Sequence, residues 1–579
     1  MNPIGFFSSP TNTAQKQYEA LRAYYVDKLS ITETSMRYNF SPAYFKKLKY
    51  YFLVALKKNQ NPFFKVKRPG PKKRFTEANV IERIVALRKK NHSITDIKVI
   101  LESYNKSLSL DTIDKILKEE GFAPLPKRTR IERLEAAIPE KIEPPQSEPL
   151  DIIDEEFSTE KGAGALIFLP LIEQMGIIKA IKNSNYPETT KLNDVSSVLS
   201  FLALKLLGNE RLSHDMTWNL DRALGLFAGL NVLPKKSTLS SYSYRVPRSS
   251  NRRLLIEMSK IFKDKGVEEG EFNLDFKTIP HWGDASILEK NWAGSRSKSI
   301  KSILSLIAED PSTGYLSYSD AEIRHRNEKD AVLDFIDFWK EGRGMPPKML
   351  IFDSKFTTYT NLNKLNESKE KIKFLTLRRR GKKLIERAYE IPELMWKKIH
   401  IEGKKRKVNT IKAYEEECHI RNYTDKVRQI IIKDHGRKNP SFLITNDFNI
   451  GLKEIIKKYA RRWLVEQEIA EQIAFFHLNS PSSSIVVKVD FDLTISLLAH
   501  NLYKVLSSKL PGFEHCTVST IYRNFIENGA LIKVENNTVT VSLKKKTHLP
   551  ILFELPWLKE ETKLSWLNLS IKFKRGTTL

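Results

Sequence analysis

Residues 452–477 read LKEIIKKYARRWLVEQEIAEQIAFFH, which has the apolar period and the length of one long amphipathic helix. With Tyr459 taken as 0° and a turn of about 100° per residue, Arg462 lies near ~300° and Glu466 near ~340°. Glu468 lies near ~180°, on the far side of the helix. We therefore expect this helix to present Tyr459, Arg462 and Glu466 together to its packing partner.

The region before this helix predicts an α/β core with a mixed five-stranded sheet. The expected order is three strands, a helix and two further strands, at 272–279, 301–308, 315–323, 328–341, 348–352 and 373–377. The fully apolar run at 348–352 is typical of a strand that is buried on both faces. Asp275 interrupts the first strand and Asp353 directly follows the fourth, so one sheet is expected to carry two acids.

The chain of 579 residues is too long for a single core, and its charge is unevenly distributed. Residues 1–130 hold 26 Lys or Arg and 11 Asp or Glu, so their net charge is 26 − 11 = +15. This is more than half of the net charge of +28 that the whole chain carries. A segment this basic predicts a polyanionic partner, most simply nucleic acid. The hydrophobic content of 41% excludes a disordered basic tail.

Two blocks of the basic segment share a layout of three helices, which is typical of tandem helix-turn-helix modules. The expected helices lie at 15–27, 30–38 and 42–58 in the first block, and at 76–90, 93–102 and 109–120 in the second. In the first block, Lys46, Lys47 and Lys49 lie where a recognition helix meets the major groove of DNA. The alternative is a pair of small helical bundles with solvated lysines. The expected helix at 109–120 is rich in acidic residues. It is therefore better suited to support another helix than to contact DNA bases itself.

Residues 65–74, KVKRPGPKKR, alternate Pro, Gly and basic residues between the two blocks. Such a ribbon can follow a narrow, negative minor groove, with Arg68, Lys72, Lys73 and Arg74 as the DNA contacts. A solvated basic linker is the alternative reading of this segment.

Residues 139–156, PEKIEPPQSEPLDIIDEE, combine seven acids with four prolines and predict an extended linker between the basic modules and the rest of the chain. The later residues 381–440 are basic and partly strand-like. The expected division is helix-turn-helix at 12–60, basic linker at 61–75, second helix-turn-helix at 76–121, acidic and proline-rich linker at 122–161, helical domain at 162–268, α/β core at 269–380 and 441–510, β-rich insertion at 381–440 and C-terminal region at 511–579.

The order of these elements, with Asp275, Asp353 and the spacing Tyr459-x2-Arg462-x3-Glu466, resembles the catalytic core of bacterial insertion-sequence DDE transposases. The stretches LDFKTIPHWGD, LIFDSKFTTY and YARRWLVEQEI are similar to one insertion-sequence group. The resemblance covers roughly residues 270–505, and it implies an RNase H-like fold interrupted by a β-rich insertion. The family's signature places a lysine seven residues after the glutamate, where this chain has Ile473.

The resemblance implies that Asp275, Asp353 and Glu466 are catalytic and hold two Mg²⁺ (or Mn²⁺) ions. Hard divalent cations prefer oxygen ligands, and two such ions about 4 Å apart activate the attacking oxygen and stabilise the leaving one. Asp284 is a rival for the first acid. Arg462 is expected to hold a DNA phosphate and Tyr459 to contact the cut strand. A DNA-facing rim is expected at Arg378, Arg379 and Arg380, or else a solvated strand end.

These observations predict a DNA transposase that binds the terminal inverted repeats of its element, cleaves the ends and joins them to target DNA. Because two ends must be handled together, a homodimer on double-stranded DNA is expected. One alternative is a DNA-binding regulator descended from a transposase with an inactive core. Another is a stand-alone RNase H-like nuclease, which would cut without the element's ends.

A bacterial cytoplasmic, nucleoid-associated location is expected from this function and from cysteine usage. Two cysteines, Cys418 and Cys516, leave no room for a disulfide framework and fit a reducing compartment. The most apolar stretch, 162–172, is about half the length that a membrane-spanning helix needs, and the N-terminus lacks the pattern of a signal peptide. No membrane partner is therefore expected.

Overall fold

The computed structural model describes residues 12–57, 62–63, 76–102, 104, 106–125, 154–189, 192–209, 218, 221–264, 270–281, 288–293, 297–356, 358–401, 410–477 and 485–576, with the backbone alone at 463–474. The chain divides into two units, Met1–Arg74 and Phe75–Leu579. The minor-groove contacts expected at Arg68, Lys72, Lys73 and Arg74, and the rival acid Asp284, lie outside the described residues.

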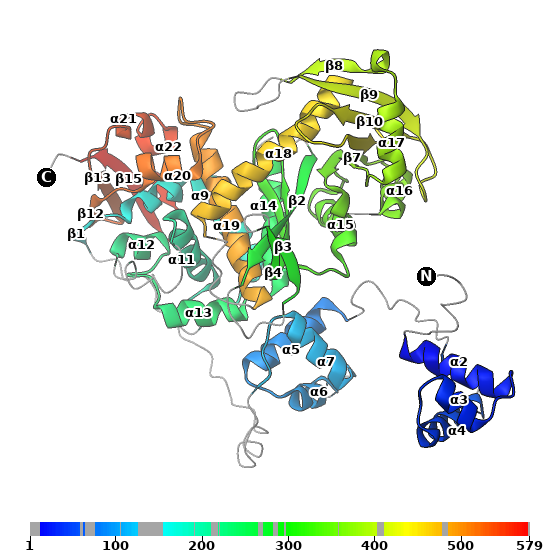
Figure 1. Cartoon of the computed structure of the whole chain (residues 1–579). Coiled ribbons are helices and arrows are strands. Elements are labelled where there is room, and N and C mark those ends of the chain that lie inside the picture. The colour runs from blue at the N-terminus through cyan, green and yellow to red at the C-terminus, as the bar shows by residue number, and fades with distance from the viewer. Residues whose placement is uncertain are drawn as a thin grey trace. The chain divides into compact units, whose positions relative to one another are not determined.

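The described residues of the first unit form three helices, and each agrees with its predicted segment to within about two residues. They are α2 (Thr13–Tyr25), α3 (Ile31–Arg37) and α4 (Pro42–Lys57) (Figure 1). Ser30 and Glu33 form a capping box at the start of α3, and Asn39 turns the chain before α4 with a positive φ of 50°. The small core consists of Ala20, Leu21, Ala23, Tyr38 and Phe45.

The second unit begins with another three-helix block, α5 (Ala78–Lys89), α6 (Ile94–Glu102) and α7 (Leu110–Glu119). This block is fixed to the remainder of its unit by the C-terminal end of α7. The carboxylate of Glu119 accepts from Arg326 at 2.7 Å, and its carbonyl accepts from Arg324 at 2.6 Å. Val486 also donates its backbone N–H to the carbonyl of Glu120 at 3.2 Å.

The linker expected between the basic modules and the rest of the chain therefore does not separate the second block from the core. Arginines of the core lie at the C-terminal end of α7. They stabilise both the negative end of the helix dipole and the carboxylates of Glu119 and Glu120. The linker expected at 122–161 also ends earlier than predicted. Glu155–Thr159 forms strand β1, because its alternating side chains let it pair with a strand near the C-terminus.

The helical region predicted at 162–268 is present. It contains α9 (Leu169–Met175), α10 (Ile177–Asn183), α11 (Asp194–Leu206), α12 (Arg222–Phe227), α13 (Lys236–Arg245) and α14 (Arg248–Asp264). Among the described residues, no single helix has the length and apolar composition to cross a membrane. Ala163–Met175 and Ile177–Asn183 meet that test only as a pair, which is bent by 71°.

The central sheet is larger than predicted. In the described part of the chain it has ten strands in the order β3-β4-β2-β6-β7-β11-β10-β9-β8, with β5 beside β4. The strands are β2 (Glu271–Pro280), β3 (Lys290–Ala293), β4 (Lys298–Glu309), β5 (Leu316–Ile323), β6 (Met349–Phe352), β7 (Lys373–Leu377), β8 (Lys397–His400), β9 (Thr410–Cys418), β10 (Val427–Lys433) and β11 (Ser441–Thr445). The five predicted strands are β2, β4, β5, β6 and β7, and β8 to β10 lie in the predicted β-rich insertion. Strands β3 and β11 are additional.

The five predicted strands form a mixed sheet in the order β5-β4-β2-β6-β7, and the strands of the predicted β-rich insertion extend this sheet through β11. Leu443 and Thr445 of β11 pair antiparallel with Leu377 and Leu375 of β7, so the insertion continues the core sheet. The unpaired backbone groups at the edge of β7 are satisfied in this way. Helices α15 (Ala331–Arg343), α16 (Tyr359–Glu367) and α17 (Lys382–Glu390) join the strands of this part of the chain.

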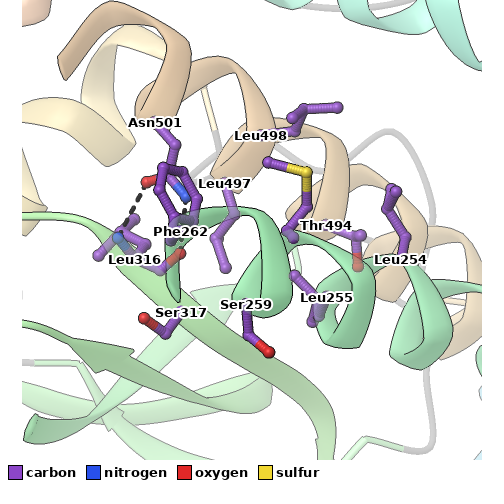
Figure 2. A pocket seen from close by; sticks show the side chains of 11 residues that line it. Leu254, Leu255, Ser259, Phe262, Leu316, Ser317, Thr494, Leu497, Leu498 and Asn501 are labelled. Carbon is purple, nitrogen blue, oxygen red and sulfur yellow. Dashed lines mark hydrogen bonds between the residues drawn. The ribbon is translucent and has the colours of Figure 1, made fainter. Parts of the chain in front are cut away.

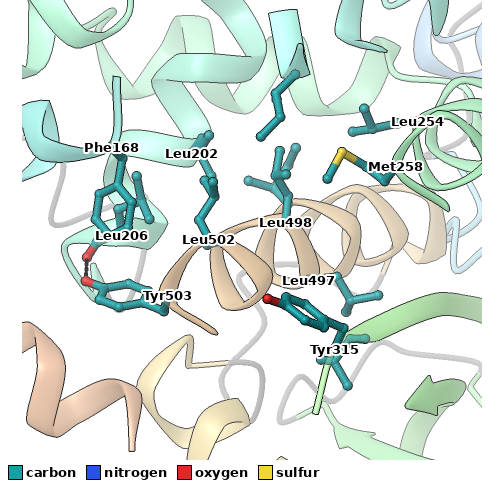
Figure 3. Close-up of a cluster of buried hydrophobic side chains, with 14 of the residues drawn as sticks. Phe168, Leu202, Leu206, Leu254, Met258, Tyr315, Leu497, Leu498, Leu502 and Tyr503 are labelled. Carbon is teal, nitrogen blue, oxygen red and sulfur yellow. Dashed lines mark hydrogen bonds between the residues drawn. The ribbon is translucent and has the colours of Figure 1, made fainter. Parts of the chain in front are cut away.

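Two long helices follow the sheet, α18 (Leu452–Phe475) and α19 (Val486–Ser507). Helix α19 is buried along almost its whole length, and Figure 3 shows Leu498 and Leu502 packed among side chains that include Leu202 of α11. The Tyr503 hydroxyl donates to the carbonyl of Leu206, which ties α19 to α11. A buried helix this apolar joins the helical region to the sheet.

The C-terminal region forms a second sheet in the order β1-β12-β13-β15-β14. The strands after β1 are β12 (Ala530–Glu535), β13 (Thr538–Leu543), β14 (Thr562–Leu564) and β15 (Leu569–Arg575). The alternating stretches on either side of Asn536-Asn537 predict a hairpin at 530–545, and β12 and β13 form it. It turns at Asn536 and Asn537, whose φ values of 49° and 59° are those of a two-residue hairpin turn.

A buried charged cluster lies where α7, α14, β5 and α19 meet. Arg248 forms ion pairs with Glu322, with Glu120 at 3.7 Å and with Asp490 at 3.9 Å. Asp320 of β5 lies in the same cluster, and burial raises the pKa of its carboxyl to about 7, although Arg248 opposes the shift. Several acids thus share one buried arginine, which makes this cluster sensitive to protons.

We predict that Asp320 lowers the stability of the protein as the pH rises from about 4 to about 7. The folded state binds this proton more tightly than the unfolded state, so ionisation in that window favours unfolding. Asp320→Asn, which cannot ionise, should flatten the fall in melting temperature between pH 5 and pH 7.5. The exposed Asp337→Asn serves as the control, and equal pH slopes for all three proteins would contradict the prediction.

Candidate active site on strands β2 and β6

The two acids predicted on the sheet are brought together by strand pairing. Strands β2 and β6 pair in parallel, with Asn273 opposite Ile351 and Leu274 opposite Phe352. The next position in that register holds Asp275 on β2 and Asp353 after β6. Neighbouring strands lie about 4.8 Å apart, so the two carboxylates are adjacent on the sheet.

Asp353 ends strand β6, whose four residues are all buried. Its Oδ1 accepts hydrogen bonds from the backbone N–H of Ser354 and from the Ser354 hydroxyl, the latter at 3.1 Å. An aspartate that bonds the backbone just after it ends a strand and starts a turn. The Asp353 carboxylate is therefore half-buried at the end of β6, and its hydrogen bonds with Ser354 fix its orientation.

Helix α18 covers the face of the sheet on which Asp275 lies. Met349 and Ile351 of β6 pack in one cluster with Leu375 of β7 and with Ile455 and Ile456 of α18. Side chains alternate between faces along a strand. Position 275 is therefore on the α18 face, and position 353 is in step with Ile351 on the same face.

Two ion pairs join α18 to β2. Lys458 Nζ lies 2.6 Å from a carboxylate oxygen of Glu271, and Arg462 Nη1 lies 3.4 Å from Oδ1 of Asp275. The helix therefore runs in the same direction as the strand. Glu466 is one turn further along, about 6 Å beyond position 462 and on the same stripe of the helix. Its side chain lies outside the described residues.

Arg462, the residue expected to hold a DNA phosphate, forms an ion pair with Asp275. Its guanidinium is buried, with the residue 4% exposed, and it is turned towards Asp275. The Arg462 guanidinium carbon also lies 5.4 Å from the centre of the Tyr459 ring. Tyr459 packs at the margin of the cluster formed by β6, β7 and α18. The predicted stripe of Tyr459 and Arg462 does face the sheet.

Among the described side chains, which do not include Glu466, no group of three or more His, Cys, Asp or Glu is placed to bind a metal ion. Asp275 and Asp353 nevertheless supply two adjacent carboxylates, which are the hard oxygen donors that Mg²⁺ and Mn²⁺ prefer. The donor set present therefore fits such a cation, with Glu466 as the expected third ligand.

The three arginines expected to form a DNA-facing rim have different surroundings. Arg378 is half-buried and donates to the Gln429 side chain at 2.5 Å, which links β7 to β10. Arg380 donates to the carbonyl of Pro440 at 3.2 Å. Arg379 is exposed. The structure thus gives Arg378 a role within the sheet, while Arg379 and Arg380 remain at the surface.

The lysines expected to read DNA also separate into two kinds. Lys46 and Lys47 are exposed on α4. Lys49 is half-buried, donates to the Tyr24 hydroxyl at 2.9 Å and lies 4.4 Å from the centre of that ring. Lys49 therefore stabilises the packing of α2 against α4, and Lys46 and Lys47 are the two accessible lysines of these three.

Sequence reasoning missed the pair between Glu271 and Lys458. A signal was present, because Glu271 precedes Asp275 by four residues and Lys458 precedes Arg462 by four. On a helix that spacing puts both cations on one face. The strand partner could not be identified without knowing that α18 lies along β2.

A small apolar cavity lies between α14, α19 and β5 (Figure 2). Its lining includes Leu255, Phe262 and Leu497, and Asn501 closes one end by bonding both the N–H and the carbonyl of Leu316 at 2.9 Å. No described lining residue carries a charge, so the cavity is an imperfection of core packing.

No protein-family model and no curated protein matches the chain. Among solved structures, a similar chain is that of a piggyBac transposase in a synaptic complex with hairpin DNA, determined by cryo-EM. It aligns with a TM-score of 0.34 and 14% sequence identity, covering 64% of this chain and 82% of that chain. A similarity this low carries no argument about the fold or the activity of the present chain.

We predict that Glu271 and Lys458 are energetically coupled. In a double-mutant cycle with Glu271→Gln and Lys458→Gln, each single substitution should lower the melting temperature, and the double substitution should lower it by less than the sum. The coupling should be roughly 0.5–1 kcal/mol, because the pair is only partly buried. Strictly additive effects would show that the pair does not hold α18.

Proposed function

We propose that this protein is a DNA transposase that binds the terminal inverted repeats of its insertion sequence, cleaves the ends and joins them to target DNA. The observation that carries the proposal is the placing of Asp275 and Asp353 at adjacent positions of parallel strands, under a helix that carries Arg462 and Glu466 on one stripe. The resemblance of these segments to insertion-sequence DDE transposases supports the same reaction. The core is proposed to be RNase H-like.

In this proposal Asp275, Asp353 and Glu466 hold two divalent cations, Mg²⁺ or Mn²⁺. When bound, such cations activate an attacking oxygen and stabilise the leaving one. Water first attacks the scissile phosphodiester and releases a 3′-hydroxyl at the element's end. That hydroxyl then attacks a phosphodiester of target DNA, which joins the strands and releases one target 3′-hydroxyl. Arg462 and Tyr459 bind the DNA strand at the cut.

DNA binding is proposed to begin with the first unit. Lys46 and Lys47 are exposed on α4, the third helix of a block with the layout of a helix-turn-helix module. Phosphate contacts by such lysines release counterions and give affinity that depends on salt. The basic segment 65–74 precedes the second unit in the sequence and is proposed to add minor-groove contacts. Because two ends are cut and joined together, a homodimer on DNA is proposed, in a bacterial cytoplasm.

The rival proposals differ in measurable ways. A DNA-binding regulator with an inactive core is favoured by Ile473, which stands where the family's signature has a lysine. Such a protein would bind element ends and leave them uncut in Mg²⁺. A stand-alone RNase H-like nuclease would cut duplexes that lack the ends. Cleavage confined to end-containing duplexes, and abolished by EDTA, distinguishes the transposase from both.

We predict that Asp353→Asn reduces strand cleavage by at least roughly 100-fold, because it removes a charged oxygen ligand from the cation site. The assay is Mg²⁺-dependent cutting of a labelled duplex that carries the inverted repeat found beside the gene. Binding of the same duplex in EDTA should stay within about twofold of wild type. Asp337→Asn, an exposed aspartate of α15, is the matched control and should cut normally. Equal cleavage by Asp353→Asn and wild type would exclude the assignment.

We predict that replacing both Lys46 and Lys47 by Gln weakens binding of the end duplex and makes it less dependent on salt. The slope of log affinity against log salt should fall in magnitude by roughly 1–2, or about 0.9 for each phosphate that is no longer neutralised. Lys49→Gln removes the same charge from the same helix, yet its ammonium is held by Tyr24. It should leave the slope nearly unchanged and lower the melting temperature instead. The reverse pattern would place the DNA on another face.

A further inference from the structure

The two ion pairs between α18 and β2 are unequal for a geometric reason. Four residues span about 13 Å along a strand and only about 6 Å along a helix. Two cations four residues apart on α18 therefore cannot both stand directly over acids four residues apart on β2. Lys458 Nζ lies 2.6 Å from a carboxylate oxygen of Glu271, whereas Arg462 Nη1 lies farther from its partner, at 3.4 Å from Oδ1 of Asp275.

The two partners of the longer pair differ in exposure. The Arg462 side chain is 5% exposed, whereas the Asp275 side chain is 25% exposed. A cation this deeply buried needs an anionic partner, because desolvation of an isolated charge is costly. Asp275 remains open to solvent, so an arriving cation can reach its carboxylate from outside. The arrangement lets a second cation compete for Asp275 without first unfolding α18.

In the proposed reaction, Asp275 and Arg462 each bind a different partner. Asp275 must give an oxygen to a divalent cation, and Arg462 must give its guanidinium to a DNA phosphate. A guanidinium and a divalent cation compete for one carboxylate, because each stabilises its charged form. The ion pair between Arg462 and Asp275 therefore opposes cation binding at Asp275.

We propose that Arg462 is an internal counter-ion of Asp275 that is exchanged when the site is loaded. Divalent cations take its place on the carboxylate, and Arg462 moves to a phosphate of the bound DNA strand. This inference rests on the proposed function. Its consequence is a coupling between cation and DNA binding, which must be reciprocal: each raises the affinity for the other by the same factor. The protein then binds the cations more tightly on DNA than without it.

The test is Mn²⁺ binding to the full-length protein, followed by electron paramagnetic resonance and by calorimetry. Without DNA, Arg462→Gln should bind Mn²⁺ about tenfold more tightly than wild type, which is the effect of removing one partly buried competing ion pair. Lys457→Gln removes the same charge from an exposed position of α18 and should change the affinity by less than about twofold. If Arg462→Gln binds no more tightly than wild type, or Lys457→Gln shows the same gain, the exchange is wrong.

DNA supplies the second arm of the test. A duplex with the element's end should tighten Mn²⁺ binding by wild type severalfold and should have little effect on Arg462→Gln, because that variant lacks the guanidinium that DNA would draw away from Asp275. Equal tightening of both proteins would overturn the proposed coupling. Asp353→Asn identifies the relevant site, since it should weaken Mn²⁺ binding at that site alone.

A measurement on the unmodified chain covers the case in which Arg462→Gln fails to fold. Phenylglyoxal modifies accessible arginines, and peptide mass mapping reports each one. The reactivity of Arg462 should rise on addition of Mn²⁺, while that of the exposed Arg379 stays constant. An Arg462 that remains unreactive in saturating Mn²⁺ would contradict its release.

The outcomes separate the two proposals. If wild type has no Mn²⁺ site that Asp353→Asn weakens, the proposed function fails and the exchange fails with it. If that site is present but neither Arg462→Gln nor DNA changes its affinity as described, only the exchange is wrong.

Discussion

The packing of α18 across the β2–β6–β7 face is the interaction on which the candidate site depends. The parallel pairing of β2 and β6 brings Asp275 and Asp353 together. It does not by itself place any side chain of another element over the two acids. The apolar packing of Ile455 and Ile456, together with the ion pair between Lys458 and Glu271, holds the helix along the strand. That placement puts Arg462 against an acid and carries Glu466 one turn beyond. The constraint is mechanical, because a rigid helix transmits its anchored register to its next turns.

The surroundings of the sheet explain how such a site is kept in place. Strand β11 pairs with β7 and connects the insertion strands β8 to β10 to the sheet, so the acids lie well inside a sheet that has ten strands in the described part of the chain. The buried helix α19 ties that sheet to the helical region, and Asn501 bonds both backbone groups of Leu316 on β5. The charged cluster around Arg248 then attaches the second three-helix block to the same body. Of the two three-helix blocks of the basic segment, the first therefore belongs to a unit of its own, and the second is fixed to the core.

Charge has two different uses in this chain. At the first unit, Lys46 and Lys47 project into solvent, where they are available to a polyanion, whereas Lys49 is held by Tyr24. Within the second unit, cations neutralise acids that packing has buried, as Arg248 does at the junction and Arg462 does at Asp275. The net charge of +28 therefore overstates the number of cations open to DNA. Burial and pairing decide which of them remain accessible.

The sequence alone determined the local elements. The 3.6-residue period fixed the stripe of Tyr459, Arg462 and Glu466, alternation and apolar runs fixed the strands that carry Asp275 and Asp353, and Asn536-Asn537 fixed a hairpin. Only the tertiary structure decided the pairing of β11 with β7, the docking of α7 and the partners of Lys458, Arg462 and Lys49. Those interactions join residues tens to hundreds of positions apart. Their selection depends on complementary shape and burial between finished elements, which no local pattern of residues records.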